Sequence, residues 1–316
     1  MITALISLIS VLFAGTLILF VAQRSIRQSR WRASAAWVLV FVILSIGWLI
    51  THDVNPYLRM VVTWVCMFLA FKTVRLMLTP QSALRDLTFP RFVGFMLWLG
   101  MDTEPWTRAR SHVPHTMRRL HEGLILAGVG FGLMVVFLWV PLAGDWWRLV
   151  RAWCAWVALV IGLFFGVTRI WLAVVNAAGR DVALLFDRPV YARTVSEWWS
   201  RRWNMPVHMV FGQAIFQPLR RRFGISGASM AVFLVSGIMH EYLLSYPASG
   251  GWGLPTLYFV VQAIGTRMEQ SRRFRRWLRA AWWRGSLWTF GVTLIPAPLL
   301  FHPALLQAVV MPLLRG

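Results

Sequence analysis

The chain has 316 residues, of which 58% are hydrophobic and only 14% are charged, and its mean hydropathy is +0.62. Because a soluble domain of this length carries roughly a quarter charged residues, the composition excludes an ordinary soluble enzyme and indicates a polytopic membrane protein. The net charge of +21 comes from arginines in short loops between apolar runs, which fits the positive-inside rule and anionic headgroups, so no nucleic-acid partner is expected.

Eight apolar stretches are long enough, or nearly so, to cross a bilayer as helices. The predicted spans are residues 2–22, 33–50, 58–78, 122–142, 152–176, 227–246, 252–268 and 285–301. The arginine-rich segments between them would then share the cytoplasmic side, and the N-terminus would lie outside. We therefore predict one all-α integral membrane domain over residues 1–316 with about eight to nine transmembrane helices.

Two further apolar stretches, Phe92–Gly100 and Pro303–Leu314, are too short for a clean crossing and are predicted to be interfacial or re-entrant. Cys66 and Cys154 lie in apolar runs without metal-type spacing, so we expect small buried hydrophobic side chains. Arginine is abundant while Lys72 is the only lysine. This bias indicates a GC-rich bacterial genome and hence the bacterial cytoplasmic membrane.

The segment 177–226 is the longest stretch without a predicted span, yet it is too aromatic for a solvated linker. We expect a cytoplasmic platform whose helices lie at the membrane interface. Thr194 or Ser196 could cap a short helix over residues 197–199, and Ser196 is the better candidate.

A second helix is expected in the same platform. Pro206 can open a helix at its first turn, and the apolar run Val207–Phe216 would continue it. Pro218 and the three arginines Arg220, Arg221 and Arg222 would then close it.

An ionisable pair, His240 and Glu241, lies inside the apolar stretch 227–246. Such a pair at membrane depth costs about 2 kcal/mol or more, which indicates chemistry or transport in the membrane. Helical spacing places four residues on one face: Ser236, Met239, His240 and Leu243. This face could line a tunnel for a lipid chain, although ordinary helix packing through Ser236 and Gly237 explains the same pattern.

Two sequence motifs occur in a fixed order. Residues 196–208 read SEWWSRRWNMPVH, and residues 236–241 read SGIMHE, with 36 positions from Asn204 to His240. Together they resemble the signature of membrane-bound O-acyltransferases, and most closely the wax-synthase-like branch, which carries an FWxRRWN-type motif and a later SGxxHE helix. The part WNMPVH also resembles the sterol and diacylglycerol acyltransferase branch. The resemblance covers residues 194–243.

This resemblance implies transfer of a fatty acyl group from a thioester, usually acyl-CoA, to the hydroxyl of a hydrophobic alcohol. It assigns the catalytic roles to an intramembrane histidine and a loop asparagine, here His240 and Asn204. A neutral imidazole can accept the proton of an attacking alcohol, and an asparagine can position it or donate to the developing oxyanion. Glu241 is a third candidate, but it cannot simply orient the neighbouring ring, and pairing with Arg267 or another helix explains it equally well.

The residues expected to contact substrate surround these positions: Trp199, Arg201, Arg202, Trp203, His208, Ser236 and Met239. Guanidinium forks match phosphate oxygens, so the arginines at 201–202 and 220–222 could bind CoA, although positive-inside anchoring explains them as well. We expect no bound cofactor, acyl-CoA as co-substrate, and an alcohol and membrane lipids as partners. The oligomeric state stays open.

Two other classes of function remain. A lipid or terpenoid cyclase on the same scaffold would need an acid, for which Glu241 or Asp187 would serve. A proton-coupled lipid transporter would use His240 and Glu241 as a relay.

A further cluster of candidate ligands comprises His112, His115 and His121 with Asp102, Glu104 and Glu122. The cluster lacks a compact zinc pattern, and the loop that carries it is rich in arginine, which opposes cation binding. We therefore expect a charged interfacial loop without a metal.

Overall fold

The computed structural model describes residues 29–140 and 144–314, together with positions 15, 18, 20, 21, 24 and 25. The regular elements of these residues are helices, which confirms the predicted all-α class. The first predicted span, residues 2–22, lies outside the described residues apart from isolated positions. The chain divides into two compact units, residues 1–114 with 175–183, and residues 115–174 with 184–316.

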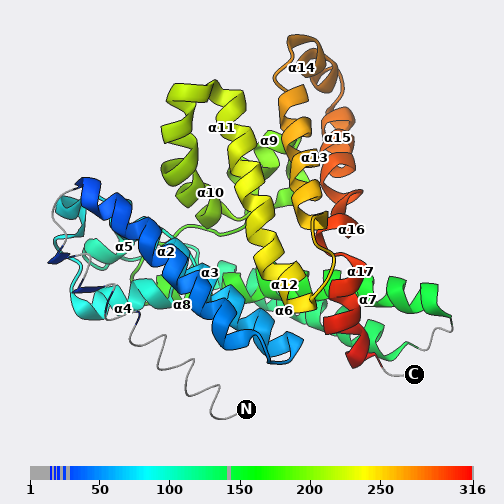
Figure 1. Cartoon of the computed structure of the whole chain (residues 1–316), viewed down its shortest axis with the longest axis horizontal. Helices are drawn as coiled ribbons and strands as arrows, with labels where there is room; N and C mark the ends of the chain where they lie inside the picture. The colour runs from blue at the N-terminus through cyan, green and yellow to red at the C-terminus, as the bar shows by residue number, and fades with distance from the viewer. Residues whose placement is uncertain are drawn as a thin grey trace. The chain divides into compact units, whose positions relative to one another are not determined.

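The first unit is built on a helical hairpin. Helices α2 (Ser29–Thr51) and α3 (Pro56–Leu78) pack side by side (Figure 1). The Asn55 side chain caps α3 by accepting the Leu58 N–H at 3.0 Å, and Pro56 occupies the first position, where a missing N–H costs little. The two helices predicted at 33–50 and 58–78 are confirmed.

The only lysine serves the structure of the first unit. Lys72 is fully buried, and its Nζ donates to the carbonyl oxygens of Phe95 and Gly100, both at 2.6 Å. Nζ also lies 3.7 Å from the centre of the Phe95 ring, a cation–π contact. Lys72 therefore fixes the end of α4 (Phe89–Leu97) and the turn after it. The short elements η1 (Gln81–Leu84) and α5 (Glu104–Thr107) complete this unit.

The second unit begins with a close helix pair. Helix α6 (Thr116–Trp139) packs against α7 (Asp145–Val160) and the π-helical η2 (Ile161–Val167), which continues into α8 (Thr168–Ala177). A Cβ added to Gly130 would lie 2.2 Å from the Gly162 nitrogen, and one at Gly166 would lie 2.4 Å from the Ala127 nitrogen. Small residues therefore let the two backbones touch, as in many membrane helix pairs.

The platform forms a folded-back pair of helices, which corrects one prediction. Pro206 opens α10 (Met205–Phe211) as expected. The helix does not close at Pro218, because η5 (Gly212–Phe216) leads directly into α11 (Gln217–His240) and Pro218 stands in its first turn, where proline is tolerated. The chain turns back instead at Gly224, whose φ of 67° suits glycine. Figure 1 shows α10 and α11 as the two arms of this turn.

Helix α11 then packs along α13 (Leu254–Met268) (Figure 1). A Cβ at Gly237 would lie 2.8 Å from the Thr256 Cα, so the backbones approach closely here. The remaining elements of the second unit are η3 (Pro189–Tyr191), α9 (Val195–Glu197), η4 (Trp198–Arg202), η6 (Glu241–Ser245), α12 (Tyr246–Ala248), α14 (Arg272–Arg279), α15 (Trp282–Leu294), α16 (Ala297–Leu300), α17 (Pro303–Leu305), η7 (Leu306–Val310) and η8 (Met311–Leu313).

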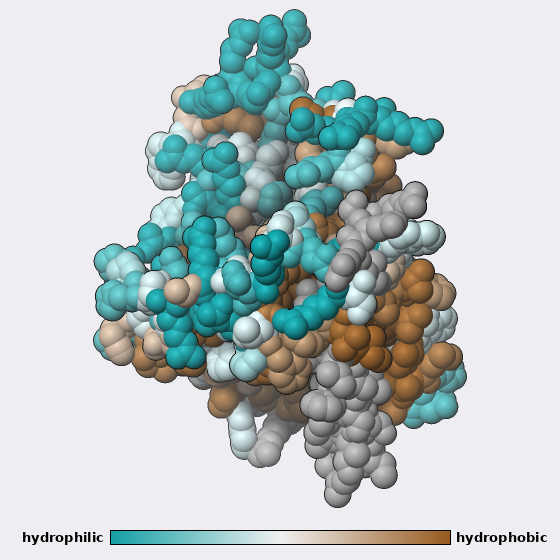
Figure 2. Space-filling model, turned by 90° about the vertical axis from the view of Figure 1, so that its left-hand side faces the viewer, coloured by the Kyte–Doolittle hydropathy of each residue, from teal (hydrophilic) through white to brown (hydrophobic). Residues whose placement is uncertain are grey.

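Within the described residues, five helical stretches are long and apolar enough to cross a membrane. They are Trp31–Thr51, Pro56–Leu78, Thr116–Trp139, Asp145–Ala177 and Met205–Ala248, and a pair bent by 53°, Trp282–Leu300 with Pro303–Leu313, could add a sixth. Figure 2 shows hydrophobic residues gathered in brown areas of the visible surface instead of being scattered. The chain is therefore an integral membrane protein. The span predicted at 252–268 is a helix of 15 residues, short for a straight crossing, so the predicted count of spans stays a prediction.

Candidate active site

His240 ends α11, immediately before the π-helical η6. Its Nδ1 lies 2.7 Å from the Ser236 carbonyl oxygen, one helical turn earlier. A carbonyl can only accept, so Nδ1 carries the proton and donates it, and Nε2 of the neutral ring is left as an acceptor. The ring centre lies 4.6 Å from that of Phe259 on α13. His240 is thus held in one tautomer, with its basic nitrogen turned away from its own helix backbone.

Trp199 joins the first motif to His240. Its ring packs on Phe259 at 5.5 Å and on Phe233 at 6.2 Å. Its indole Nε1 donates to Gln262 Oε1 at 3.1 Å, and the Gln262 amide donates to the Val292 carbonyl at 2.7 Å. The structure therefore brings Trp199 and His240 into one aromatic cluster through Phe259.

The other tryptophans of the motif point into a second cluster. Trp198 is buried and stacks on Trp203, with ring centres 5.4 Å apart. Trp203 also contacts Phe186 at 5.2 Å and Phe165 at 5.8 Å. The π-helical turn η4 separates neighbouring tryptophans in this way, and such turns are common at functional sites. Trp203 is thus placed against loop and helix side chains distinct from the ring contacts of Trp199.

Asn204 has left-handed backbone angles, with φ 46° and ψ 56°. Asparagine tolerates this region better than most residues. Its carbonyl accepts the His208 N–H at 3.2 Å, while its side chain does not cap α10. Backbone strain of this kind gathers at functional sites. Among the described residues no hydrogen bond joins Asn204 to His240, and His208 is exposed on the first turn of α10.

Thr194 and Ser196 both form hydrogen bonds at the start of the short helix α9, but only Thr194 caps it. Thr194 Oγ1 accepts the Glu197 N–H at 2.9 Å, so the prediction that Ser196 is the cap is wrong. The cap position needs an extended backbone, which Thr194 has with φ −146° and ψ 150°. Ser196 lies inside the turn, and its hydroxyl donates to Glu269 Oε2 at 2.6 Å.

Glu269 is a buried residue that sequence reasoning missed. Besides the Ser196 hydroxyl, its carboxylate accepts the backbone N–H groups of Val195 at 2.5 Å and Ser196 at 3.0 Å. It also accepts the Trp288 indole N–H at 2.9 Å. The only signal in the sequence was a single acidic residue in the arginine-rich segment 267–284. Glu269 ties the end of α13 to the start of the motif.

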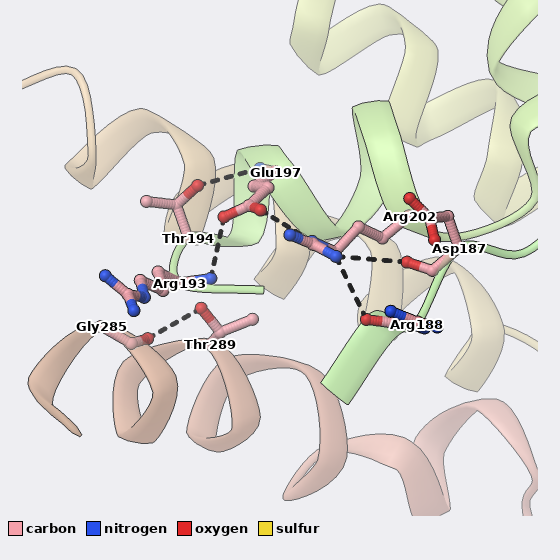
Figure 3. A network of polar contacts seen from close by, with 8 residues as sticks. All are labelled: Asp187, Arg188, Arg193, Thr194, Glu197, Arg202, Gly285 and Thr289. Carbon is pink, nitrogen blue, oxygen red and sulfur yellow. Dashed lines mark hydrogen bonds and ion pairs between the residues drawn. The ribbon is translucent and has the colours of Figure 1, made fainter. Parts of the chain in front are cut away.

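A clamp between Glu197 and Arg202 holds the motif against the preceding loop (Figure 3). Arg202 Nε donates to Glu197 Oε1 at 2.7 Å, and its Nη1 donates to the carbonyls of Asp187 at 3.3 Å and Arg188 at 3.4 Å. Burial opposes ionisation of Glu197, but hydrogen bonds from the Arg193 N–H and from Arg202 outweigh it and lower its pKa. Arg202 therefore has a structural task, while Arg201 is exposed.

Glu241 caps a helix and does not pair with Arg267. Its Oε1 accepts the N–H groups of Gly253 at 3.1 Å and Thr256 at 3.0 Å, and the Thr256 hydroxyl at 2.7 Å, all at the start of α13. Its Oε2 is buried and makes no hydrogen bond within the described residues. Arg267 donates instead to Gln270 Oε1 at 3.2 Å. The pairing with Arg267 considered from the sequence is therefore wrong.

A second histidine, His302, contacts Ser245 in η6, the element that begins with Glu241. This residue was not predicted from the sequence. It is fully buried, and its Nδ1 accepts the Leu305 N–H at 3.2 Å. Its Nε2 therefore carries the proton, and it lies 3.3 Å from the Ser245 hydroxyl oxygen. Ser245 follows Glu241 by four residues in η6. His302 falls outside both motifs, so only its position in an apolar stretch could have drawn notice.

The predicted common face of α11 is present. Ser236, Met239 and Leu243 are each buried, whereas Ile238 is 65% exposed.

Of the cysteines, Cys66 is buried and Cys154 is half-buried. The described residues contain no cluster of three or more histidine, cysteine, aspartate or glutamate side chains that could hold a metal ion. His115 and Glu122 lie instead among arginines, in the lining of a polar pocket.

Comparison with known proteins bears on the region just described. Residues 182–261 match the model of the Membrane bound O-acyl transferase family. This part of the chain is similar to the membrane-bound O-acyltransferase superfamily. The match contains both sequence motifs, together with the Glu241 cap and the Phe259 contact. It confirms the resemblance read from residues 194–243.

Curated relatives agree with the wax-synthase-like branch of this superfamily. The chain is 34% identical over 101 residues to the Long-chain-alcohol O-fatty-acyltransferase of Simmondsia chinensis, covering 29% of this chain and 28% of the relative. It is 31% identical over 150 residues to the Probable long-chain-alcohol O-fatty-acyltransferase 9 of Arabidopsis thaliana, covering 43% of each. The Acyl-CoA--sterol O-acyltransferase 1 of Arabidopsis thaliana is 32% identical over 98 residues, 27% of this chain and 28% of the relative. The chain thus aligns with less than half the length of these relatives.

Proposed function

We propose that this protein is a membrane-bound O-acyltransferase that moves a fatty acyl group from acyl-CoA to the hydroxyl of a hydrophobic alcohol within the membrane. The names of the relatives, long-chain-alcohol O-fatty-acyltransferases, support the fatty acyl group and the long-chain alcohol. The observation that carries the proposal is the bond from His240 Nδ1 to the Ser236 carbonyl. It leaves Nε2 of a neutral imidazole available as a general base at membrane depth.

In the proposed reaction, His240 acts as the general base. The alcohol oxygen attacks the thioester carbonyl carbon while His240 Nε2 accepts the hydroxyl proton. The tetrahedral intermediate then breaks its C–S bond, and the departing thiolate takes the proton from Nε2. The products are the ester and free CoA, and the histidine returns to its neutral form. Asn204 would position the attacking alcohol or donate a hydrogen bond to the oxyanion.

Glu241 takes the role of a positioning residue in this scheme. It binds the first N–H groups of α13 through Oε1, and α13 carries Phe259, whose ring packs on His240. A substrate chain would lie along the buried face of Ser236 and Met239 and against Trp199 and Trp203. Arg201 and His208, which are exposed, would meet the polar part of acyl-CoA.

The proposal includes an orientation. The arginine-rich segments would face the cytoplasm of a bacterial cell, with the N-terminus outside, so acyl-CoA would arrive from the cytoplasmic side. The alcohol would enter from the bilayer. The chain would act as one membrane domain without a bound cofactor.

A cyclase is the second candidate, and one observation favours it. Glu241 Oε2 is buried without a hydrogen bond, as expected of a group kept for a substrate. A cyclase would work without acyl-CoA and would depend on Glu241 or Asp187. A proton-coupled transporter would use His240 and Glu241 and produce no new compound.

The test is product analysis by mass spectrometry. The full chain in nanodiscs would receive labelled palmitoyl-CoA and a panel of fatty alcohols, sterols, diacylglycerol and terpenoid alcohols. We expect labelled ester from the wild type and a loss of about 100-fold or more in His240→Ala. Ile238→Ala is the matched control, since this side chain projects from the exposed face of α11. Ester formation that is indifferent to His240, or none from a folded wild type, would overturn the proposal.

A further inference from the structure

A polar pocket of the second unit lies apart from the His240 cluster. Its volume is about 210 Å³, well above the roughly 10–15 Å³ that a cavity needs to hold one water molecule. The start of α6, helix α8 and the loop before η3 line it. The lining side chains include four arginines and two other groups: Arg118, Arg119, Arg169, Arg188, His115 and Glu122.

The charges of this pocket do not balance. Asp187 also lines it, so two carboxylates face four guanidinium groups and an excess of two positive charges remains. Glu122 Oε1 lies 3.3 Å from Arg118 Nε, and its Oε2 lies 3.6 Å from Arg169 Nε. One carboxylate is thus shared between two arginines, which favours a further anion in the pocket.

Two guanidinium groups in the lining of this pocket have a buried nitrogen without a hydrogen-bond partner among the described residues. The Arg169 side chain is only 8% exposed, and its Nε makes no hydrogen bond within the described residues. The same holds for the buried Nη1 of Arg119. A buried donor left unpaired costs about 1–3 kcal/mol or more when charged, and an oxyanion in the pocket would offset that cost.

The backbone around the pocket is also unusual. His115, with φ 62°, and Arg188, with φ 44°, are two of the four non-glycine residues with positive φ in the described part of the chain. His115 precedes the first turn of α6, a helix of 24 residues without a side-chain cap at that end. The positive end of the helix dipole therefore faces the arginines, an arrangement that attracts anions.

We propose that this pocket binds a phosphate group. Guanidinium forks bind phosphate oxygens in pairs, and the group could belong to a phospholipid headgroup or to a soluble ligand such as CoA. Arg202 bonds to the carbonyls of Asp187 and Arg188 (Figure 3), so one wall of the pocket is tied to the sequence motif. The phosphate chemistry stands independently of the proposed function, and only CoA as the source rests on it.

Binding to the full chain in nanodiscs tests the proposal in two arms. The first arm measures the affinity for CoA and for pyrophosphate in phosphatidylcholine discs. The second arm measures, by native mass spectrometry, how much phosphatidic acid stays bound in discs that contain one part in five of that lipid. The phosphate source is a soluble ligand if the first arm responds to the pocket variants, and a headgroup if the second does.

Variants of opposite sign make the test decisive. Arg119→Gln removes a donor and should weaken binding about tenfold, whereas Glu122→Gln releases Arg118 and Arg169 and should strengthen it. Arg276→Gln is the control, because this exposed arginine of α14 loses the same charge outside the pocket. A gain in Glu122→Gln could not come from partial unfolding. If both variants behave as Arg276→Gln does in both arms, the proposal is overturned.

The outcome is separable from that of the proposed function, because binding needs no turnover. Phosphate binding by a chain that forms no ester would overturn the proposed function alone. Ester formation by a chain whose pocket variants leave both arms unchanged would overturn the phosphate site alone.

Discussion

The two ends of α13 lie beside two glutamates that perform the same local task to different degrees. Glu241 accepts the first N–H groups of α13 itself, and Glu269, just past its last turn, accepts those of α9. Carboxylates at helix N-termini satisfy N–H groups that have no partner within the helix. Both residues therefore help to hold the motif. Glu269 does so through α9, and Glu241 does so through α13 and its Phe259.

The difference lies in the second oxygen. Both oxygens of Glu269 accept hydrogen bonds, and the Ser196 hydroxyl and the Trp288 indole complete its set of donors. At Glu241 only Oε1 is bonded in the described structure, and Oε2 is buried without a partner. Unsatisfied buried oxygens are rare in folded proteins. A saturated carboxylate indicates an anchor, and the unsaturated one stands next to the candidate base.

Removing the anchor should have the largest effect. Glu269→Ala leaves the N–H groups of Val195 and Ser196 and the Trp288 indole without their acceptor. We expect a loss of about 3–5 kcal/mol, enough to deplete the folded protein. Size-exclusion profiles and thermal unfolding in detergent would measure it. Glu269→Gln keeps an acceptor oxygen and should fall between, and an alanine variant as stable as the wild type would refute the anchor.

Changing the other carboxylate should separate capping from chemistry. Glu241→Ala removes three hydrogen bonds from the start of α13 and should cost about 2 kcal/mol of stability and about tenfold in ester formation. Glu241→Gln retains an acceptor oxygen for Thr256, so we expect activity within about threefold of the wild type. Assays of both variants beside thermal unfolding would decide. A stable Glu241→Gln protein with activity reduced 100-fold would show that the second oxygen takes part in the chemistry.

The neighbours of Glu241 should matter less. His302→Ala removes the acceptor of the Leu305 N–H and the contact to Ser245, and should destabilise by about 1 kcal/mol. His302→Asn can still cap α17 and should recover part of the loss. Combining His302→Ala with Ser245→Ala should cost less than the sum of the single changes, because both remove one shared bond. Strict additivity in thermal unfolding would contradict that coupling.

The smallest effect should come from pH acting on the Glu197 clamp. Hydrogen bonds hold the pKa of Glu197 below its ordinary value of 4.5 despite burial. Its contribution to stability is therefore present above about pH 4.5 and is lost as pH falls through the lower pKa of the folded chain. The stability difference between wild type and Glu197→Gln, below about 1 kcal/mol, should shrink from pH 6 to pH 3. In Arg202→Gln this pH dependence should weaken, and an unchanged profile would argue against the clamp.

Much of the fold and of the motif was predictable, because the relevant signals are local. The length of an apolar run predicts a membrane helix, and α2 and α3 occur as expected. The order and spacing of residues 196–208 and 236–241 are properties of the chain alone, and the family match over residues 182–261 contains both stretches. Pro206 opens a helix because its ring fixes the backbone wherever it stands.

The errors arose where two local signals compete. Thr194 and Ser196 are both good caps, and the cap is the residue whose backbone is extended. Glu269, more than 70 residues later in the chain, accepts the Val195 N–H and the Ser196 hydroxyl and so favours Thr194 as the cap. Pro218 and the arginines after it suggested a helix end, but proline is tolerated in a first turn, and the reversal fell to Gly224. Neither outcome follows from propensity alone.

The sequence by itself determined the membrane class, the all-α fold and the motif, because hydrophobic length and residue spacing do not depend on partners. Only the tertiary structure decided what Glu241, Glu269 and His302 contact, and that arginines from residues 118 to 188 share one pocket. Those contacts join residues far apart in sequence. They exist because helix packing brings the N–H groups, carboxylates and guanidinium groups within hydrogen-bonding distance, which no local pattern encodes.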